Sequence, residues 1–270
     1  MSNPSSVDLQ TAGPGSLPPF GPAETPTNVR HVVLAFLAAM TFVLYLDRVC
    51  IGQSAKHIKD ELGITNFQMS WINNAFVISY AVFEIPTGRW GDTFGSRRIL
   101  SRIVIWWSIF PMLTGAATGF VMLLAVRFLF GAGEAGALPN SARVLREWFP
   151  ESKRGWAQGI VTTAMMLGGA TAPITSQWLI LQMGWRWTFG VFGLVGLAWA
   201  LAFYWWFRDN PAEHPATNQA ERELILADGD KTRTSGGKNL EVHGAIPWKL
   251  VLSNPNIWLL GMVMITMSAV

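Results

Sequence analysis

Five charged residues lie within long apolar stretches of the 270-residue sequence: Asp47, Arg48, Glu84, Arg127 and Glu134. A charge at the centre of a bilayer costs at least about 2.5 to 3.5 kcal/mol, so each one needs a structural or functional explanation. Arginine presents a planar fork of donors that fits a carboxylate, and a buried carboxyl can take up and release a proton. Together these residue types indicate the capture of an organic anion coupled to proton movement.

The composition supports a membrane setting for these charges. Hydrophobic residues make up 50% of the chain and charged residues only 14%, whereas soluble domains carry roughly a quarter charged residues. Apolar segments of about 20 residues predict membrane-spanning helices at 31–52, 69–88, 99–117, 120–143, 157–181 and 186–207. A seventh begins near Asn256 and stops at Val270. We therefore predict an all-α membrane protein, a six-helix bundle truncated in its seventh helix.

Helix geometry brings the two buried arginines to a similar depth. Asp47 and Arg48 come about 16 residues into the first span, roughly 24 Å from its start. Arg127 comes about 7 residues into the fourth span, roughly 10 Å below the opposite edge. Glu134 follows two helical turns later on nearly the same face. We expect a cavity that shows both guanidinium groups with carboxyl groups close by.

Structural ion pairs are the alternative interpretation of these charges. Asp47 could pair with Arg48, and Glu134 with a residue of a neighbouring helix. Two arginines at one depth favour substrate binding by Arg48 and Arg127 and proton coupling by Asp47 and Glu134. Neutral side chains that could bind the same substrate, each equally compatible with packing, are Tyr45, Tyr80 and Asn73.

Lysine and arginine are unevenly distributed between the two ends of the predicted spans. Fifteen of the 20 fall on the side of the N-terminal tail and the 208–254 segment, which the positive-inside rule makes cytoplasmic. We predict a disordered tail (1–29), a transmembrane bundle (30–207), a cytoplasmic loop (208–254) with a short surface helix at Gln219 to Ala227, and the start of a seventh helix (255–270). The protein is thus expected to be multi-pass in a cell membrane, such as a prokaryotic inner membrane.

Other classes of function find little support in the sequence. The single cysteine, Cys50, cannot form an internal disulfide, and the four histidines lack metal-ligand spacing. We find no nucleophile elbow or phosphate-binding loop. The formal charge of +3 needs no nucleic acid to explain it. The sequence therefore predicts neither an enzyme nor a metal protein, and no cofactor, with the proton as the coupling ion.

Glycine and proline predict how the spans pack and bend. Gly131, Gly133 and Gly168 lie among other small residues and are expected to let helices approach closely. Pro173 predicts a bend in the fifth span, and Pro139 a loosening of the fourth span below Glu134.

Four stretches, taken together, resemble the major facilitator superfamily, and within it the anion:cation symporter family. One of them, Phe207 to Pro215, resembles the opening of the family's central loop. The loop after the second span matches the superfamily signature of Gly, Asp, Gly and basic residues, with Thr93 at a position expected to be basic: Gly88, Asp92, Gly95, Arg97 and Arg98. Tyr45-Leu-Asp47-Arg48 resembles the family's Tyr-x-Asp-Arg. The segment from Arg127 through Glu134 to Ala135 resembles its helix-four motif.

The resemblance implies a role for each matching residue. In that family the matching arginines, Arg48 and Arg127, hold the substrate carboxylate, and Asp47 and Glu134 take part in proton coupling. The implied function is symport of protons with a small organic anion, either a sugar acid (hexonate, glucarate or hexuronate) or an aromatic carboxylate, by alternating access in the lipid bilayer.

A complete cavity then needs the missing C-terminal half or a second copy, because family members have two six-helix halves. The alternatives are a non-transporting membrane fragment or scaffold, and a major-facilitator exporter of other solutes.

Overall fold

The structure, a computed structural model, describes residues 25–226 and Ser253. The described residues up to 226 lie in one compact unit within Met1–Lys231. The predicted seventh helix, most of the predicted tail and the far part of the predicted loop fall outside the described residues. So do five side chains of the second helix: Ile85, Arg89, Gly91, Asp92 and Thr93.

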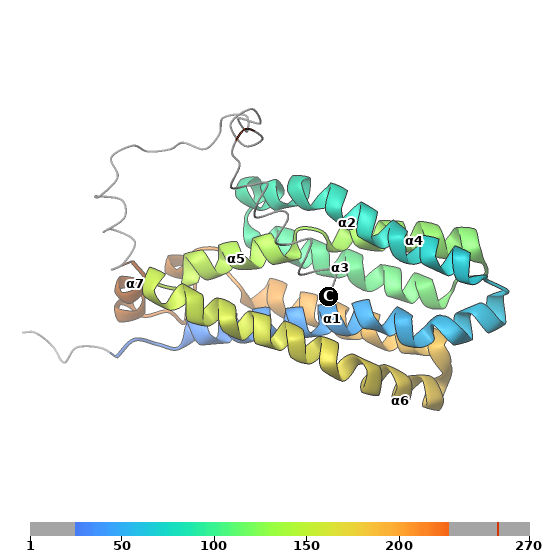
Figure 1. Ribbon diagram of the computed structural model, residues 1–270. Coiled ribbons are helices and arrows are strands. Elements are labelled where there is room, and N and C mark those ends of the chain that lie inside the picture. The colour runs from blue at the N-terminus through green and yellow to red at the C-terminus, as the bar shows by residue number, and fades with distance from the viewer. Residues whose placement is uncertain (1–24, 227–252, 254–270) are drawn as a thin grey trace, which may run out of the picture. The chain divides into compact units, whose positions relative to one another are not determined.

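Helices build the described unit, as Figure 1 shows. In chain order they are α1 (Val29–Leu62), α2 (Asn66–Phe94), α3 (Ser96–Gly115), α4 (Phe120–Glu134), α5 (Ala137–Trp148), α6 (Glu151–Trp206), the 3-10 turn η1 (Pro211–Glu213) and α7 (Gln219–Leu226). The described residues contain no strand. The predicted all-α architecture is therefore confirmed for this part of the chain.

The predicted spans all lie on these helices. α1, α2 and α3 contain the first three spans, and α4 with α5 contains the fourth. α6 contains the fifth and sixth, which Gly184 separates with a non-helical backbone (φ 82°, ψ 161°). Among the described residues, three helical stretches are long and apolar enough by themselves to cross a membrane: Val29–Leu62, Phe120–Trp148 and Glu151–Trp206.

A break in the fourth span places Glu134 at the end of α4. Gly136 has a left-handed backbone (φ 87°), and a Cβ there would lie 2.5 Å from the Oγ1 of Thr87. Only glycine accepts both conditions. Pro139 lies in the first turn of α5, where its missing N–H costs little. The predicted loosening below Glu134 is confirmed, with Gly136 as its main cause, whereas α6 runs through Pro173 without leaving helical geometry.

Small residues set the distances between the packed helices. α1 packs mainly on α6, α2 on α4, and α3 on both α4 and α6 (Figure 1). A Cβ at Gly131 would overlap the carbonyl of Phe76 on α2, and one at Gly168 would overlap the carbonyl of Phe42 on α1. The predicted close approach of the helices at these two glycines is confirmed, because a larger side chain would push them apart.

Buried apolar side chains form two clusters along the bundle. On α1, Leu44 belongs to the first cluster and Leu46 to the second. On α4, Phe130 belongs to the first and Leu123 to the second. Arg127 lies between Leu123 and Phe130, where α4 passes from the second cluster to the first.

The N-terminus of α3 is capped by a residue from beyond α6. Gly95 precedes α3 with φ 82° and offers no side chain for a cap. The backbone N–H of Arg97 instead donates to Oδ1 of Asp209 at 2.7 Å. The guanidinium of Arg97 donates to the carbonyl of Tyr204, at 2.8 Å from Nε. The predicted loop signature is thus connected to the end of α6.

α7 closes the same end of the bundle against α1. Glu221 is fully buried and accepts hydrogen bonds from the backbone N–H of Val29 (3.3 Å) and of Arg30 (3.1 Å). It also forms an ion pair with the Arg30 guanidinium at 3.2 Å. We expected a surface helix here. One face of α7 is instead buried, because the carboxylate of Glu221 caps the start of α1.

At the opposite end, Arg186 joins three elements. Its Nε donates to Glu61 on α1 at 2.9 Å, and its Nη1 donates to the carbonyls of Gly115 (2.7 Å) and Ala117 (2.8 Å). The indole N–H of Trp185 donates to the second Glu61 oxygen at 2.6 Å. These contacts hold the ends of α1 and α3 beside the break in α6.

Replacing Asp209 by Ala is expected to destabilise the bundle, because the α3 N-terminus loses its only side-chain cap among the described residues. Loss of such a cap costs about 1 kcal/mol, which corresponds to ~3 °C in the unfolding midpoint of the detergent-solubilised protein. The matched variant Asp209→Asn keeps an acceptor oxygen and should lose less. An Asn variant as unstable as the Ala variant would argue against capping.

Glu61 predicts a pH dependence of stability. Hydrogen bonds from Trp185 and Arg186 lower its pKa below the usual 4.5. The folded state thus favours the ionised carboxylate, so this stabilisation is complete above pH 4.5 and is lost as the pH falls through the lowered pKa. Between about pH 5 and about pH 3, the unfolding midpoint should fall more in the native protein than in Glu61→Gln. The exposed neighbour Asp60, changed to Asn, is the control, and equal slopes in native protein and Glu61→Gln would contradict the prediction.

Candidate functional site

A cavity of about 370 Å³ lies between α1, α2 and α4, and both predicted arginines line it. Its walls are formed by Arg48, Val49, Ile51, Gly52, Gln53, Asn73, Phe76, Val77 and Arg127. The volume falls in the range of small-molecule sites. The structure therefore brings Arg48, Arg127 and Asn73 together from three helices, and the similar depth of the two arginines in their spans predicts that they meet.

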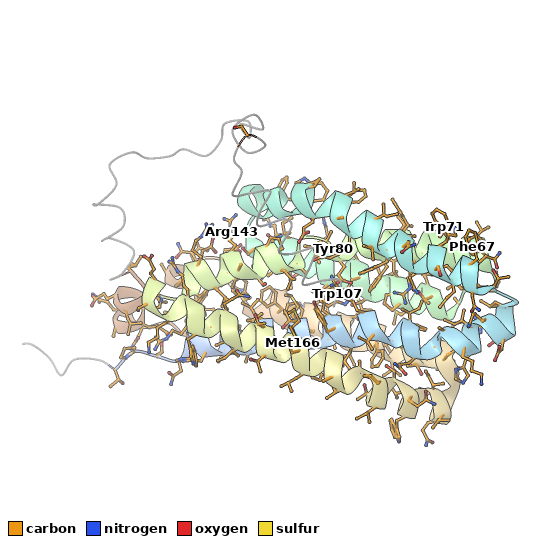
Figure 2. The ribbon with its side chains drawn as sticks, viewed as in Figure 1. Phe67, Trp71, Tyr80, Trp107, Arg143 and Met166 are labelled. Atoms are coloured by element: carbon orange, nitrogen blue, oxygen red, sulfur yellow. The ribbon has the colours of Figure 1, made fainter. Side chains whose placement is uncertain are left out.

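Arg48 lies in a cage of aromatic rings and pairs with a carboxylate. Its guanidinium carbon lies 4.6 Å from the ring centre of Tyr80, 5.2 Å from that of Tyr45 and 5.3 Å from that of Phe76. Its Nε donates to a carboxylate oxygen of Glu134. Tyr80 lies on α2 in Figure 2. Both predicted tyrosines thus contact Arg48 through their ring faces, which stabilises its charge in an apolar setting.

Arg127 is buried, with 4% of its surface exposed, and differs from Arg48 in its contacts. Its guanidinium lies over the rings of Phe130 (5.2 Å) and Phe189 (5.9 Å). Within the described residues it makes no hydrogen bond, and its Nε is fully enclosed. A buried guanidinium without an acceptor is costly, so Arg127 is poised to accept an anion from the cavity.

The two carboxylates complete a compact group of four charges. Asp47 is buried, and neither of its oxygens has a hydrogen-bond partner among the described residues. It does not pair with Arg48, but it lies within electrostatic range of Arg127 and Glu134. Glu134 is fully buried and has one oxygen without a partner. Of the two structural ion pairs considered, only that between Glu134 and a neighbouring helix is formed.

The residues of the loop signature lie at one end of the bundle, the end where α5 and α7 are found. Gly88 faces Pro139, to which a Cβ would come within 3.7 Å, an ordinary contact. Gly95 and Arg97 shape and fix the start of α3, and Arg98 is exposed there. The side chain of Asp92, the acidic residue of the signature, lies outside the described part. Gly88, Gly95, Arg97 and Arg98 do not line the cavity of the two arginines.

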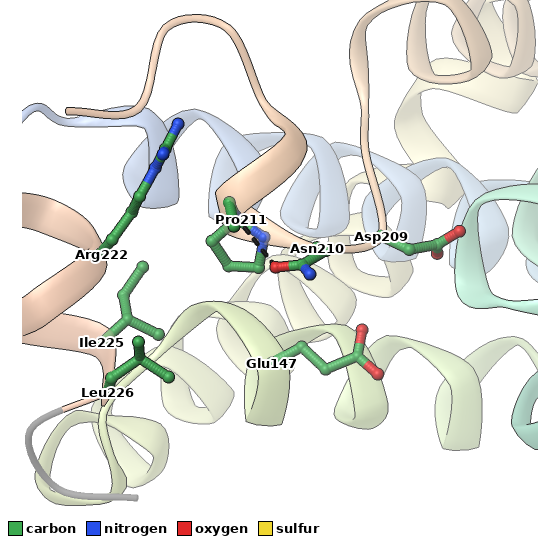
Figure 3. Close-up of a pocket in the computed structure, with 8 residues that line it drawn as sticks. Glu147, Asp209, Asn210, Pro211, Arg222, Ile225 and Leu226 are labelled. Atoms are coloured by element: carbon green, nitrogen blue, oxygen red, sulfur yellow. Dashed lines mark hydrogen bonds between the residues drawn. The ribbon is translucent and has the colours of Figure 1, made fainter. Parts of the chain in front are cut away.

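Figure 3 shows a second cavity of about 370 Å³ at this end. It lies between Glu147 on α5, the turn of Asp209 to Pro211, and Arg222 and Ile225 on α7. Burial raises the pKa of Glu147, which also forms an ion pair with Arg143 at 2.9 Å. The sequence pattern gives no sign of this cavity, because its walls come from segments more than 60 residues apart.

Among the residues of the first cavity that sequence reasoning missed, Phe76 is the aromatic one. It contributes both to the cavity wall and to the ring cage around Arg48. A signal existed: Asn73, Phe76 and Tyr80 are spaced by three and four residues, which places them on one face of α2. Both flanking residues were predicted, and the aromatic residue between them was not.

Comparison with known proteins agrees with this architecture. The family model of the Major Facilitator Superfamily matches residues 37–270. The probable sulfoacetate transporter SauU of Cupriavidus necator is 34% identical over 223 residues, which cover 82% of this chain and 50% of that protein. The D-galactonate transporter of Escherichia coli is 31% identical over 236 residues, 85% of this chain and 54% of that protein.

A third relative, the probable galactarate/D-glucarate transporter GudP of Bacillus subtilis, is 31% identical over 77% of this chain and 47% of its own length. The chain thus spans about half the length of the curated relatives it matches. These relatives are transporters, which agrees with the prediction that the protein is not an enzyme.

Solved structures share the fold. A bacterial homolog of the human lysosomal transporter Spinster superposes with a TM-score of 0.62 at 26% identity, over 68% of this chain and 44% of that one. The proton:xylose symporter XylE gives a TM-score of 0.60 at 14% identity, over 74% of this chain and 49% of its own, which supports the fold alone. With the family model, these matches show that the chain is a membrane protein belonging to the major facilitator superfamily.

Proposed function

We propose that this chain forms the anion-binding half of a secondary active transporter that carries a small organic anion together with protons. The observation that carries the proposal is that Arg48 and Arg127 line one cavity inside an apolar bundle. Two guanidinium groups at such a depth suit a carboxylate or sulfonate. The names of three relatives, transporters of sulfoacetate, galactarate/D-glucarate and D-galactonate, support the same class of substrate.

Substrate binding and proton binding are linked in this proposal through Glu134. An incoming carboxylate competes with Glu134 for Arg48, while Arg127 has no hydrogen bond to give up within the described residues. Once displaced, the fully buried Glu134 carboxylate would lack its partner, which is strongly unfavourable unless it is protonated. Anion binding therefore favours a proton on Glu134, and Asp47 offers a second carboxyl for the same purpose.

The membrane potential opposes inward movement of an anion, which explains why a proton would move with it. Moving a net negative charge inward against a potential of 100 mV costs about 2.3 kcal/mol. A proton carried with each carboxylate removes that cost. We therefore infer inward symport, with the residues of the arginine cavity exposed alternately to the two sides of the membrane.

A complete substrate site requires a second wall. Carriers with alternating access place the substrate between two helical units that rock against each other. In this proposal the second wall comes from a C-terminal six-helix half or from another copy of the chain. Transport by the described bundle alone is the question that separates a working carrier from a non-transporting fragment.

Arg127→Ala is expected to abolish anion uptake. In proteoliposomes containing the 270-residue chain, the initial rate of labelled sulfoacetate, galactarate or D-galactonate uptake should fall at least ~30-fold, since truncating one side of a buried charged contact costs about 2 to 5 kcal/mol. The exposed Arg146 at the end of α5, changed to Ala, is the matched control and should retain uptake. Undiminished uptake by Arg127→Ala would reject the site.

If the folded native chain shows no uptake, calorimetric binding of the same anions decides between the two interpretations. Binding that depends on Arg127 would support an anion site that needs a second wall for transport. Absence of binding would favour the non-transporting fragment.

Glu134→Gln is expected to separate anion binding from proton coupling. The neutral amide keeps the shape of the side chain but cannot take up a proton. Uptake measured with an inward proton gradient, divided by uptake without it, should fall to about one. Glu84→Gln, a carboxyl that does not line the cavity, is the control. Full gradient dependence in Glu134→Gln would assign the coupling to another group.

A further inference from the structure

A larger cavity lies at the end of the bundle where α1 and α6 begin, and it shares no residue with the arginine cavity. Its volume is about 800 Å³. The walls include basic side chains on one side and apolar ones on the other: Arg30, His31, Lys153, Phe149, Trp156 and Leu224. The proposed transport mechanism uses none of these residues.

On the basic side of this cavity, one charge has no ion-pair partner among the described residues. Arg30 forms an ion pair with Glu221, which fixes its guanidinium at the rim and balances its charge. Lys153 is exposed and makes no side-chain hydrogen bond or ion pair within the described part of the chain. Glu151 is exposed two residues before Lys153 but does not line the cavity. The cavity therefore offers an ammonium group to an anion.

The apolar side orients the imidazole of His31. Its ring lies edge-on to Phe149 (6.2 Å, 77°) and to Trp156 (6.2 Å, 84°). Trp156 is 53% exposed and Leu224 closes the cavity from α7. A ring N–H of His31 and the ammonium of Lys153 thus border a wall of aromatic and aliphatic carbon, an arrangement that fits a ligand with an anionic head and an apolar body.

The position of the cavity along the bundle indicates which ligand of this kind it binds. Arg30 directly precedes the first predicted span, and Lys153 and Trp156 directly precede the fifth, so the cavity lies at a membrane boundary, on the side predicted to be cytoplasmic. Tryptophan is favoured at that depth, and basic pockets between helix ends bind anionic head groups. We propose that this cavity binds the phosphate of an anionic phospholipid, with the glycerol and upper acyl carbons against Trp156. A soluble phosphate would leave the apolar wall without a partner.

The test compares lipids on the purified 270-residue chain in an uncharged detergent. The unfolding midpoint is followed while the mole fraction of dioleoylphosphatidylglycerol is raised, with dioleoylphosphatidylcholine and glycerol 3-phosphate as comparators. The variant changes His31 and Lys153 to Gln, and the matched control changes the exposed pair His57 and Lys56 of α1, at the opposite end of the bundle, to Gln. All four side chains are exposed, so both variants are expected to fold.

We expect phosphatidylglycerol to raise the midpoint of the native chain and of the control by ~3 °C, and phosphatidylcholine to have little effect. The His31/Lys153 variant should need about fivefold more phosphatidylglycerol for half of the shift. If the native chain and the variant needed the same amount of phosphatidylglycerol, the proposed binding site would be wrong. A shift of the same size with glycerol 3-phosphate would show that the ligand is a soluble phosphate ester and not a lipid, which rejects the proposal. A shift of the same size with phosphatidylcholine would reject the claim that the lipid must be anionic.

Discussion

The pairing of Arg48 with Glu134 is the interaction around which the bundle is arranged. It joins α1 to α4 inside the apolar bundle, so the two helices must hold Arg48 and Glu134 at the same level. Gly131 permits α4 to approach α2, and the left-handed Gly136 ends α4 directly after the glutamate. Along α4, Arg127 lies where the helix passes from one apolar cluster to the other, between Leu123 and Phe130.

This group of charges is formally neutral but unevenly satisfied. One arginine has a carboxylate, three aromatic rings and a place in the cavity wall, while the other has only rings within the described residues. Asp47 has no hydrogen bond there at all. Buried polar atoms without partners are rare in a purely structural arrangement. Such an arrangement is stable enough to fold and leaves donors and acceptors available to a ligand, which a fully satisfied network would not.

Much of the fold and the site follows from local sequence. The length of the apolar segments gives the helices, and helical spacing with antiparallel spans brings Arg48 near Arg127. The contacts of Asp209 with Arg97 and of Glu221 with Arg30 could not be predicted, because the partners lie 112 and 191 residues apart. The sequence also could not predict whether Arg48 pairs with Asp47 or with Glu134, because the rotation of the helices about their axes decides which carboxylate it meets. The signature residue Asp92 was recognised by resemblance, and its side chain lies outside the described part.

The cap that Glu221 places on α1 has a consequence for how the chain is made. The first helix leaves the ribosome long before the carboxylate that completes its N-terminus, because Glu221 follows Arg30 by 191 positions. At synthesis rates of 5 to 20 residues per second, that interval lasts roughly 10 to 40 s. During it the backbone N–H groups at the start of α1 depend on water or lipid head groups. Final closure of this end of the bundle is therefore a late step of biosynthesis, after the six predicted spans have been synthesised.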